Sequence, residues 1–307
     1  MILRDIKNKI KNSKFRIIIL ASLFIYIFLF LCIKNEFFYS ASQYNHKYLD
    51  YYIQTYLAGE ANDLIFENDV MMYIESGVKN IYSALYLYVV TFSGNIYLLF
   101  SILISIYIFY YISSTFYCDI YKGNSLLQIF RIGEKKYIKK TIISNSLYCG
   151  LLILLPRIMY YLLLNIFFPN GVSYVHFLGD TSFISEKFLY VGYNYSPFLM
   201  ICLDFVMSFC YGIIISLISL IIVSIIKNKS LSYIIFVFAI SAFSIIPLIW
   251  HQVPLIFYSS IYTYSNMLNV PSIEINVYEP IVISTIMLVV LLIVTKFVLK
   301  YRVRKFI

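Results

Sequence analysis

The sequence predicts an all-α, polytopic membrane protein with six transmembrane helices and both termini in the cytosol, built as one domain over residues 1–307. Two observations lead to this fold class. The chain is 61% hydrophobic and only 13% charged, whereas soluble domains carry about 25% charged residues. Its apolar residues also fall into runs of about 20, the length that a helix needs to cross a bilayer.

Six apolar runs are long enough to form spanning helices. They are Ile17–Ile33, Ile96–Tyr117, Thr141–Phe168, Phe198–Ile226, Ser232–Trp250 and Ile281–Leu299. A further apolar stretch at 81–92 is followed by Ser93, Gly94 and Asn95, and we assign it to the loop before the second span. A seventh span there would reverse the orientation of every later loop and destroy the charge pattern described next.

The charge pattern orients these spans. With both termini in the cytosol, the inner segments 1–16, 118–140, 227–231 and 296–307 hold 19 Lys or Arg residues and three acids. The outer segments hold four lysines and eleven acids. An excess of basic residues in short cytosolic loops is the positive-inside pattern. The net charge of +9 is therefore explained by the bilayer and does not call for nucleic acid.

The N-terminal segment 1–16 is basic and precedes the first span. Ile6 and Ile10 between lysines favour a short amphipathic helix at the cytosolic interface, and a disordered basic tail is the alternative. The apolar run that follows has 17 bulky residues, which is longer than the apolar part of a signal peptide. We therefore expect an uncleaved membrane anchor.

Residues 34–95 form the largest predicted extracellular loop. Apolar residues recur within it at helical spacing, at Tyr48, Leu49, Tyr52, Ile53, Tyr56 and Leu57, and an acidic run from Glu60 to Glu75 follows. An amphipathic helix resting on the outer leaflet accounts for the spacing. The acidic run also suggests a vestibule that attracts a cationic peptide. The later outer stretch 251–280 is too short and broken to span.

The cytosolic loop 118–140 contains a second predicted short helix. Asn124 suits the N-cap position and Gly133 suits the residue after the helix. We expect an apolar side made of Leu126, Leu127, Phe130 and Ile129. Such a helix could rest on anionic headgroups beside the lysines that follow it, or it could present a knob to a cytosolic partner.

This loop resembles the one between the second and third spans of ABC-2-type transporter permeases. In that family an acidic residue ends the second span, a glycine follows, and leucines of a coupling helix precede basic residues. The matching or neighbouring positions here are Asp119, Gly123, Asn124, Leu126, Leu127, Phe130, Arg131, Lys135 and Lys140. The sequence differs from the family pattern in having Asp in place of Glu at 119, Asn in place of Thr at 124, and no proline before the basic residue.

The resemblance implies a partner for this helix. A separate cytosolic ATPase chain, carrying ATP and Mg, would dock on it and drive alternating access. A second permease subunit, identical or a sibling, would complete the membrane pathway. The resemblance further implies that 251–280 is re-entrant and gates the exit.

Two ionisable residues fall inside the predicted spans. Counting 1.5 Å per residue, Arg157 lies about 16 Å from Phe168, and Asp204 lies about 10 Å from Pro197. Both belong to the outer half of the membrane, where an unpaired charge is costly. We therefore expect an Arg157–Asp204 ion pair between the third and fourth spans. A role in contacting cargo is the alternative, as is an Arg157 side chain that extends to the outer interface. The adjacent Pro156 is expected to kink the third span.

Several chemistries lack their sequence signatures. The five cysteines lie in or at the ends of spans, and Cys202 and Cys210 are about 12 Å apart along one helix, too far for a disulfide. The three histidines are scattered over three outer segments, so no metal site is expected. The chain contains no phosphate-binding loop and no nucleophile elbow, so we expect neither ATP hydrolysis nor a cofactor bound by this chain.

Three functions of different classes follow. The leading one is the permease subunit of an ATP-driven exporter of a bacteriocin-like peptide or another amphipathic compound. An intramembrane enzyme is disfavoured, because the spans hold no catalytic constellation. A non-transporting accessory or sensor subunit of a membrane envelope complex is the remaining alternative.

Overall fold

A computed structural model describes residues 9, 15–31, 84, 88, 91, 95–121, 124–167, 197–249 and 278–304. The described residues are helical apart from short connections, and no strand occurs among them, so the all-α class is confirmed for this part of the chain. The predicted amphipathic helix near residues 48–57 lies outside the described residues. So do all but the last three residues of 251–280 and all but three residues of 1–16.

The described helices follow the predicted apolar runs. They are an N-terminal helix Phe15–Leu31, α5 Asn95–Tyr121, α6 Asn124–Ile132, α7 Glu134–Phe167, α9 Pro197–Ile225, α10 Lys229–Ile249 and α13 Tyr278–Arg304. Three of them contain a segment long and apolar enough to cross a membrane, namely Ser101–Asp119 in α5, Glu134–Phe167 and Ile201–Ile225 in α9. The N-terminal helix and α10 hold shorter apolar segments. A membrane location follows from the three long apolar helices.

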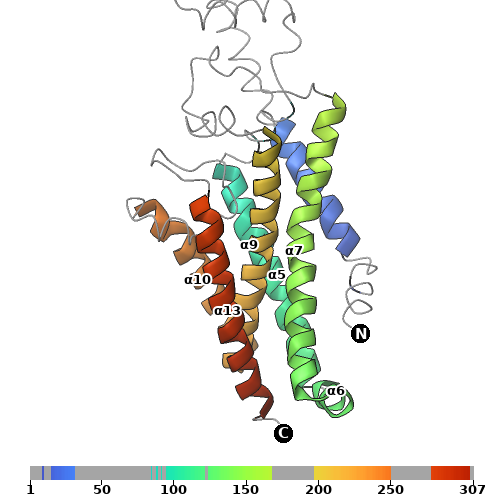
Figure 1. Cartoon of the computed structure of the whole chain (residues 1–307), viewed down its shortest axis with the longest axis vertical. Helices are drawn as coiled ribbons and strands as arrows, with labels where there is room; N and C mark the ends of the chain where they lie inside the picture. Colours follow the sequence, from blue (N-terminus) through green and yellow to red (C-terminus); the bar gives the residue numbers. More distant parts are fainter. Residues whose placement is uncertain are drawn as a thin grey trace, which may run out of the picture.

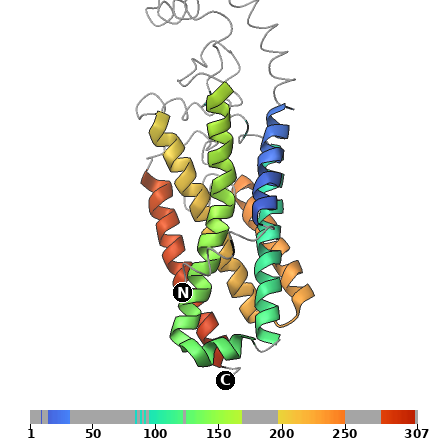
Figure 2. The ribbon, with the colours of Figure 1, turned by 90° about the vertical axis from the view of Figure 1, so that its right-hand side faces the viewer.

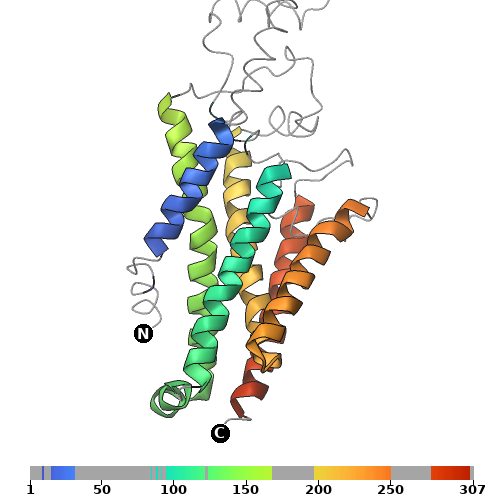
Figure 3. The same ribbon diagram turned by 180° about the vertical axis from the view of Figure 1, so that it is seen from behind.

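The helices form an elongated bundle around α9 (Figure 1). Helix α9 packs against α5, α7, α10 and α13, and it is therefore the central element of the described fold. Helix α6 and the last turns of α13 lie at the same end of the bundle, which we name the α6 end (Figure 2). The N-terminal helix and α10 lie on opposite sides (Figure 3). The end of α5, the starts of α7 and α10, and the end of α13 all lie at the α6 end, as the predicted alternation of spans requires.

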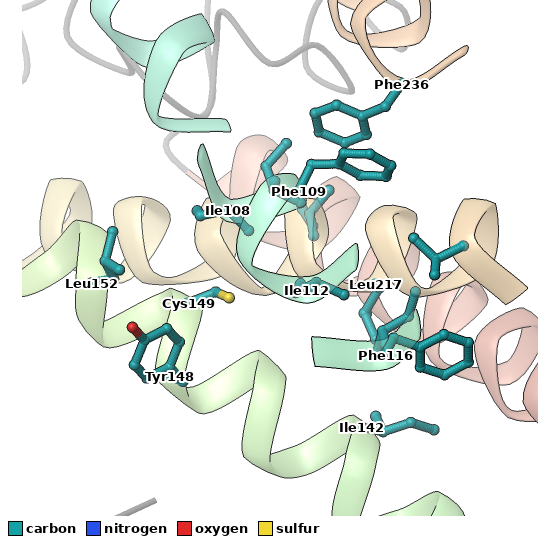
Figure 4. Packing of buried hydrophobic residues seen from close by; sticks show 14 of the residues in the cluster. Ile108, Phe109, Ile112, Phe116, Ile142, Tyr148, Cys149, Leu152, Leu217 and Phe236 are labelled. Carbon is teal, nitrogen blue, oxygen red and sulfur yellow. The ribbon is translucent and has the colours of Figure 1, made fainter. Parts of the chain in front are cut away.

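The apolar core lies between α5, α7, α9 and α10 (Figure 4). Phe109 of α5 stacks on Phe236 of α10 with ring centroids 4.2 Å apart. Hydroxyl groups tie the same helices together, because Tyr211 of α9 shares a 2.5 Å hydrogen bond with Ser105 of α5. Buried hydroxyls of this kind join helices in a bilayer, where water offers them no alternative partner.

Small residues bring α7 and α9 into close contact. Ser208, Gly212 and Ser216 recur every four residues on the buried side of α9, the spacing that lets two helix backbones approach in a membrane. A Cβ atom added at Gly212 would lie 2.5 Å from the carbonyl oxygen of Cys149 and 2.8 Å from the Cα of Gly150, both on α7. Glycine at 212 is therefore required by the distance between the two backbones.

Helix α7 begins seven residues before the predicted span. A single residue, Gly133, separates it from α6, so the lysines 135, 136, 139 and 140 lie on the first two turns of α7 rather than in a loop. At 1.5 Å per residue its 34 residues measure about 51 Å, longer than the ~30 Å hydrocarbon core. The helix continues through Pro156 to Phe167, and the kink at Pro156 stays a prediction.

Candidate functional site

Helix α6 is the first part of the candidate site, and its sequence defines both of its ends. It runs from Asn124 to Ile132 with apolar residues on one side and polar residues on the other. Gly133 follows it with a φ of +81°, a left-handed conformation that glycine adopts without steric cost. The amide of Gly133 donates to the carbonyl of Ile129, and the carbonyl of Gly133 accepts from Tyr137 of α7. The glycine thus joins two helices through one tight turn.

The apolar side chains of α6 differ in how far they are exposed. Ile129 is 7% exposed and packs into the bundle with Ser125, whereas Leu127 is 63% exposed and Phe130 is 78% exposed. Leu126 is half-buried. The apolar side expected from the sequence is therefore present, but the bundle covers only part of it, burying Ile129 and leaving Leu127 and Phe130 exposed. We name this exposed Leu127–Phe130 pair the α6 face.

The other predicted docking residues differ in their exposure. Asp119 is half-buried in the last turn of α5, while Arg131 and Lys135 are exposed. Asn124 is the first residue of α6, its side chain lies outside the described residues, and Gly123 is not described. The exposed apolar pair is therefore followed along the chain by exposed positive charge. This combination suits a partner surface with an apolar pocket and acidic rim.

Weak polar contacts hold α6 and its surroundings in place. Lys140 of α7 donates to the side-chain oxygen of Gln128 at 3.4 Å. Arg304 of α13 pairs with Glu134 of α7 at 3.3 Å, with 63% of the arginine side chain exposed. Exposed pairs of this kind contribute little to stability. The position of α6 therefore depends mainly on burial of Ile129.

The buried charges form the second part of the candidate site. One Nη atom of Arg157 lies 2.6 Å and 2.8 Å from the two carboxylate oxygens of Asp204, and both side chains are at most 1% exposed. The same nitrogen donates to the hydroxyl of Ser208, which in turn donates to the backbone carbonyl of Asp204. The structure thus brings together the two residues that the sequence analysis pairs, across the contact between α7 and α9.

The structure adds a third partner to this pair. Tyr88, which is fully buried, donates its hydroxyl to the second oxygen of Asp204 at 2.5 Å. Three residues later, Thr91 shares a 2.8 Å hydrogen bond with the hydroxyl of Tyr160 on α7. Ala84, four positions before Tyr88 in the sequence, is also fully buried. Residues 84, 88 and 91 are helical and contribute to the interior, whereas the sequence analysis leaves 81–92 in the outer loop.

A sequence signal for these residues exists. Ala84, Tyr88 and Thr91 follow each other at spacings of four and three, which places them on one side of a helix. Two polar groups on such a side, within an otherwise apolar stretch, indicate buried hydrogen-bond partners. Their partners on α7 and α9 are 69 and 116 residues away, so the pairing itself needs the tertiary structure.

The two sites differ in the chemical groups that they present. Among the described residues, no group of three or more His, Cys, Asp and Glu side chains could hold a metal ion. The three histidines lie outside the described residues. The Arg157–Asp204 pair is neutral as a unit and surrounded by hydroxyl donors, an arrangement that stabilises helix packing. The α6 face is the feature that is suited to a partner.

Comparison with known proteins adds no family. No protein-family model matches this sequence, and neither does any curated protein or solved structure. The interpretation therefore depends on the residues and their arrangement.

Proposed function

We propose that this chain is the membrane-spanning permease subunit of an ATP-driven exporter, with α6 as the coupling helix on which a separate ATPase docks. The observation that carries the proposal is the α6 face. Leu127 and Phe130 are exposed beyond the apolar segment that ends at Asp119 and before the lysines that open α7. Large apolar side chains in such a place mark a binding surface. The resemblance of this loop to that of ABC-2-type permeases is the reason for proposing an ATPase as the partner.

The proposal includes the full topology. The N-terminal helix, α5, α7, α9, α10 and α13 would be the six spans, and the α6 end would face the cytosol with both termini. Lys227, Lys229, Lys296 and Lys300 are exposed and belong, with the lysines of α7, to segments at the α6 end. This grouping supports the proposed orientation, because basic residues collect on the cytosolic side of membrane proteins. The chain would then be a multi-pass protein of the cell membrane.

The partners and cargo follow from the same proposal. ATP and Mg would bind the partner ATPase, a second permease subunit would complete the pathway, and the bilayer would surround the exposed apolar residues of α13. The cargo would be a peptide or another amphipathic compound. The acidic run of residues 60–75, which the structure does not describe, favours a cationic one.

Co-purification tests this proposal. The full-length protein is isolated from its native membranes in mild detergent, and ATP hydrolysis is measured in the eluate. Leu127→Asp/Phe130→Asp is expected to lower the co-purified activity at least about tenfold, because two desolvated apolar contacts at the centre of an interface would be lost. The protein itself should reach normal membrane levels, since both side chains are exposed.

A matched control adds two acids elsewhere at the α6 end. Asn228 is exposed just before α10 and Ser230 is exposed in its first turn, and Asn228→Asp/Ser230→Asp retains an oxygen that can cap α10. This variant should keep the ATPase. If the wild type brings down no ATPase, or if both double variants retain it equally, α6 is not a coupling helix. The accessory or sensor role would then lead.

A further inference from the structure

We propose that Tyr88 and Thr91 form a two-point strap that fastens the chain preceding α5 across the α7–α9 contact, and that covers the Arg157–Asp204 pair until it is released. The two residues lie three positions apart in the sequence, and both are helical. Tyr88 binds Asp204 of α9, whereas Thr91 binds Tyr160 of α7. Two residues close together in the sequence are therefore bonded to both helices at once.

The geometry shows what the strap restrains. Gly150 and Gly212 bring the backbones of α7 and α9 together near the middle of both helices. Arg157 and Asp204 lie beyond that contact, in the half of the bundle away from α6. Separation of the two helices in that half must lengthen either the Tyr88–Asp204 bond or the Thr91–Tyr160 bond, since the strap cannot follow both helices.

The interactions at the strap are strong and involve buried side chains. The Tyr88 hydroxyl donates to a carboxylate, and hydrogen bonds to charged groups are about twice as strong as neutral ones. The ring of Tyr88 packs edge-on against Tyr161 of α7 and Phe205 of α9, with centroids 5.5 Å and 6.3 Å away. Release would therefore uncover a charged pair and an aromatic surface together. This combination suits transient contact with an amphipathic cargo. That use rests on the proposed function, whereas the existence of the strap is independent of it.

The strap is tested by the reactivity of a buried cysteine in the purified full-length protein. The five native cysteines are replaced by alanine, Ala84→Cys is introduced, and its reaction with a small maleimide is timed in detergent against the same protein unfolded in SDS. Ala84 is fully buried and lies four positions before Tyr88 in the sequence, so its reaction reports how often the strap leaves the bundle. Tyr88→Phe should raise the rate about 10-fold, because a hydrogen bond to a charged group is lost. Thr91→Val should raise it about 2- to 10-fold through loss of a neutral hydrogen bond.

Tyr161→Phe is the matched control. It removes a hydroxyl from the same aromatic cluster while leaving the Tyr88–Asp204 bond, and the labelling rate should stay within twofold. The strap is excluded if Tyr88→Phe changes the rate less than twofold, or if Tyr161→Phe raises it equally. If Tyr88→Phe fails to fold, Thr91→Val is used instead, and a change of less than twofold in its labelling rate excludes the strap. The assay needs no ATPase, so its outcome is independent of the co-purification result.

Discussion

Replacing Arg157 by glutamine is expected to lower the free energy of unfolding by about 3–5 kcal/mol, the cost of leaving one member of a buried ion pair without its partner. Asp204 is 1% exposed, and the arginine supplies a donor to both of its oxygens. Among the described residues, the Tyr88 hydroxyl would then be the remaining donor to this buried carboxylate. The loss should appear as a lower thermal unfolding temperature in detergent, followed by size-exclusion chromatography of the heated sample.

A double variant separates pairing from the effect of each residue alone. Arg157→Gln/Asp204→Asn removes both charges, so it should be more stable than Arg157→Gln by at least about 1 kcal/mol, because no uncompensated charge stays buried. The charge swap Arg157→Asp/Asp204→Arg should also recover part of the stability. Strictly additive effects of the two single substitutions would show that the pair is not coupled.

Gly212→Ala is expected to destabilise the bundle by about 1–3 kcal/mol, the range for an over-packed interior. The added methyl group would collide with the backbone of α7, at the carbonyl of Cys149 and the Cα of Gly150, and neither atom can rotate away. The two helices must therefore separate, which loosens the contact that is central to the bundle. Thermal unfolding in detergent measures the effect, and Gly212→Leu should prevent accumulation of folded protein.

Gly150→Ala provides the comparison on the facing helix. Its added Cβ would meet the ring of Phe209 at 2.6 Å, and a side chain can move where a backbone cannot. We therefore expect a clearly smaller loss of stability than for Gly212→Ala. An equal or larger loss of stability for Gly150→Ala would mean that the backbone distance between α7 and α9 does not determine which side chain fits at position 212.

The positions of the helices are largely predictable from the sequence, because long apolar runs leave little choice in a bilayer. The described helices α5, α9 and α10 start and end within a few residues of the expected spans. Helix α7 is the exception. Its first turns are lysine-rich, with only Tyr137 and Ile138 as apolar residues before the predicted span. A single residue, Gly133, makes the turn from α6, so the helix starts at Glu134.

The details of both candidate sites depend on tertiary contacts. The helical period places Leu127, Ile129 and Phe130 on neighbouring parts of α6, and only its packing on the bundle decides that Ile129 is the buried one. The Arg157–Asp204 pair can be anticipated because charges in spans need partners. Tyr88 cannot be assigned in the same way. Tyrosine is abundant in this chain, with 32 copies, so its residue type alone does not distinguish a buried donor from an interfacial ring.

The most direct measurement for the proposed docking role is photo-crosslinking from α6 in intact cells. A benzophenone-bearing amino acid replaces Phe130 in one strain and Leu103 of α5 in another. Both side chains are exposed, but Leu103 lies in the apolar segment of α5. The proposal predicts that position 130 crosslinks to a nucleotide-binding ATPase, whereas position 103 does not. Lipid adducts alone from position 130, or the same protein captured from both positions, would contradict it.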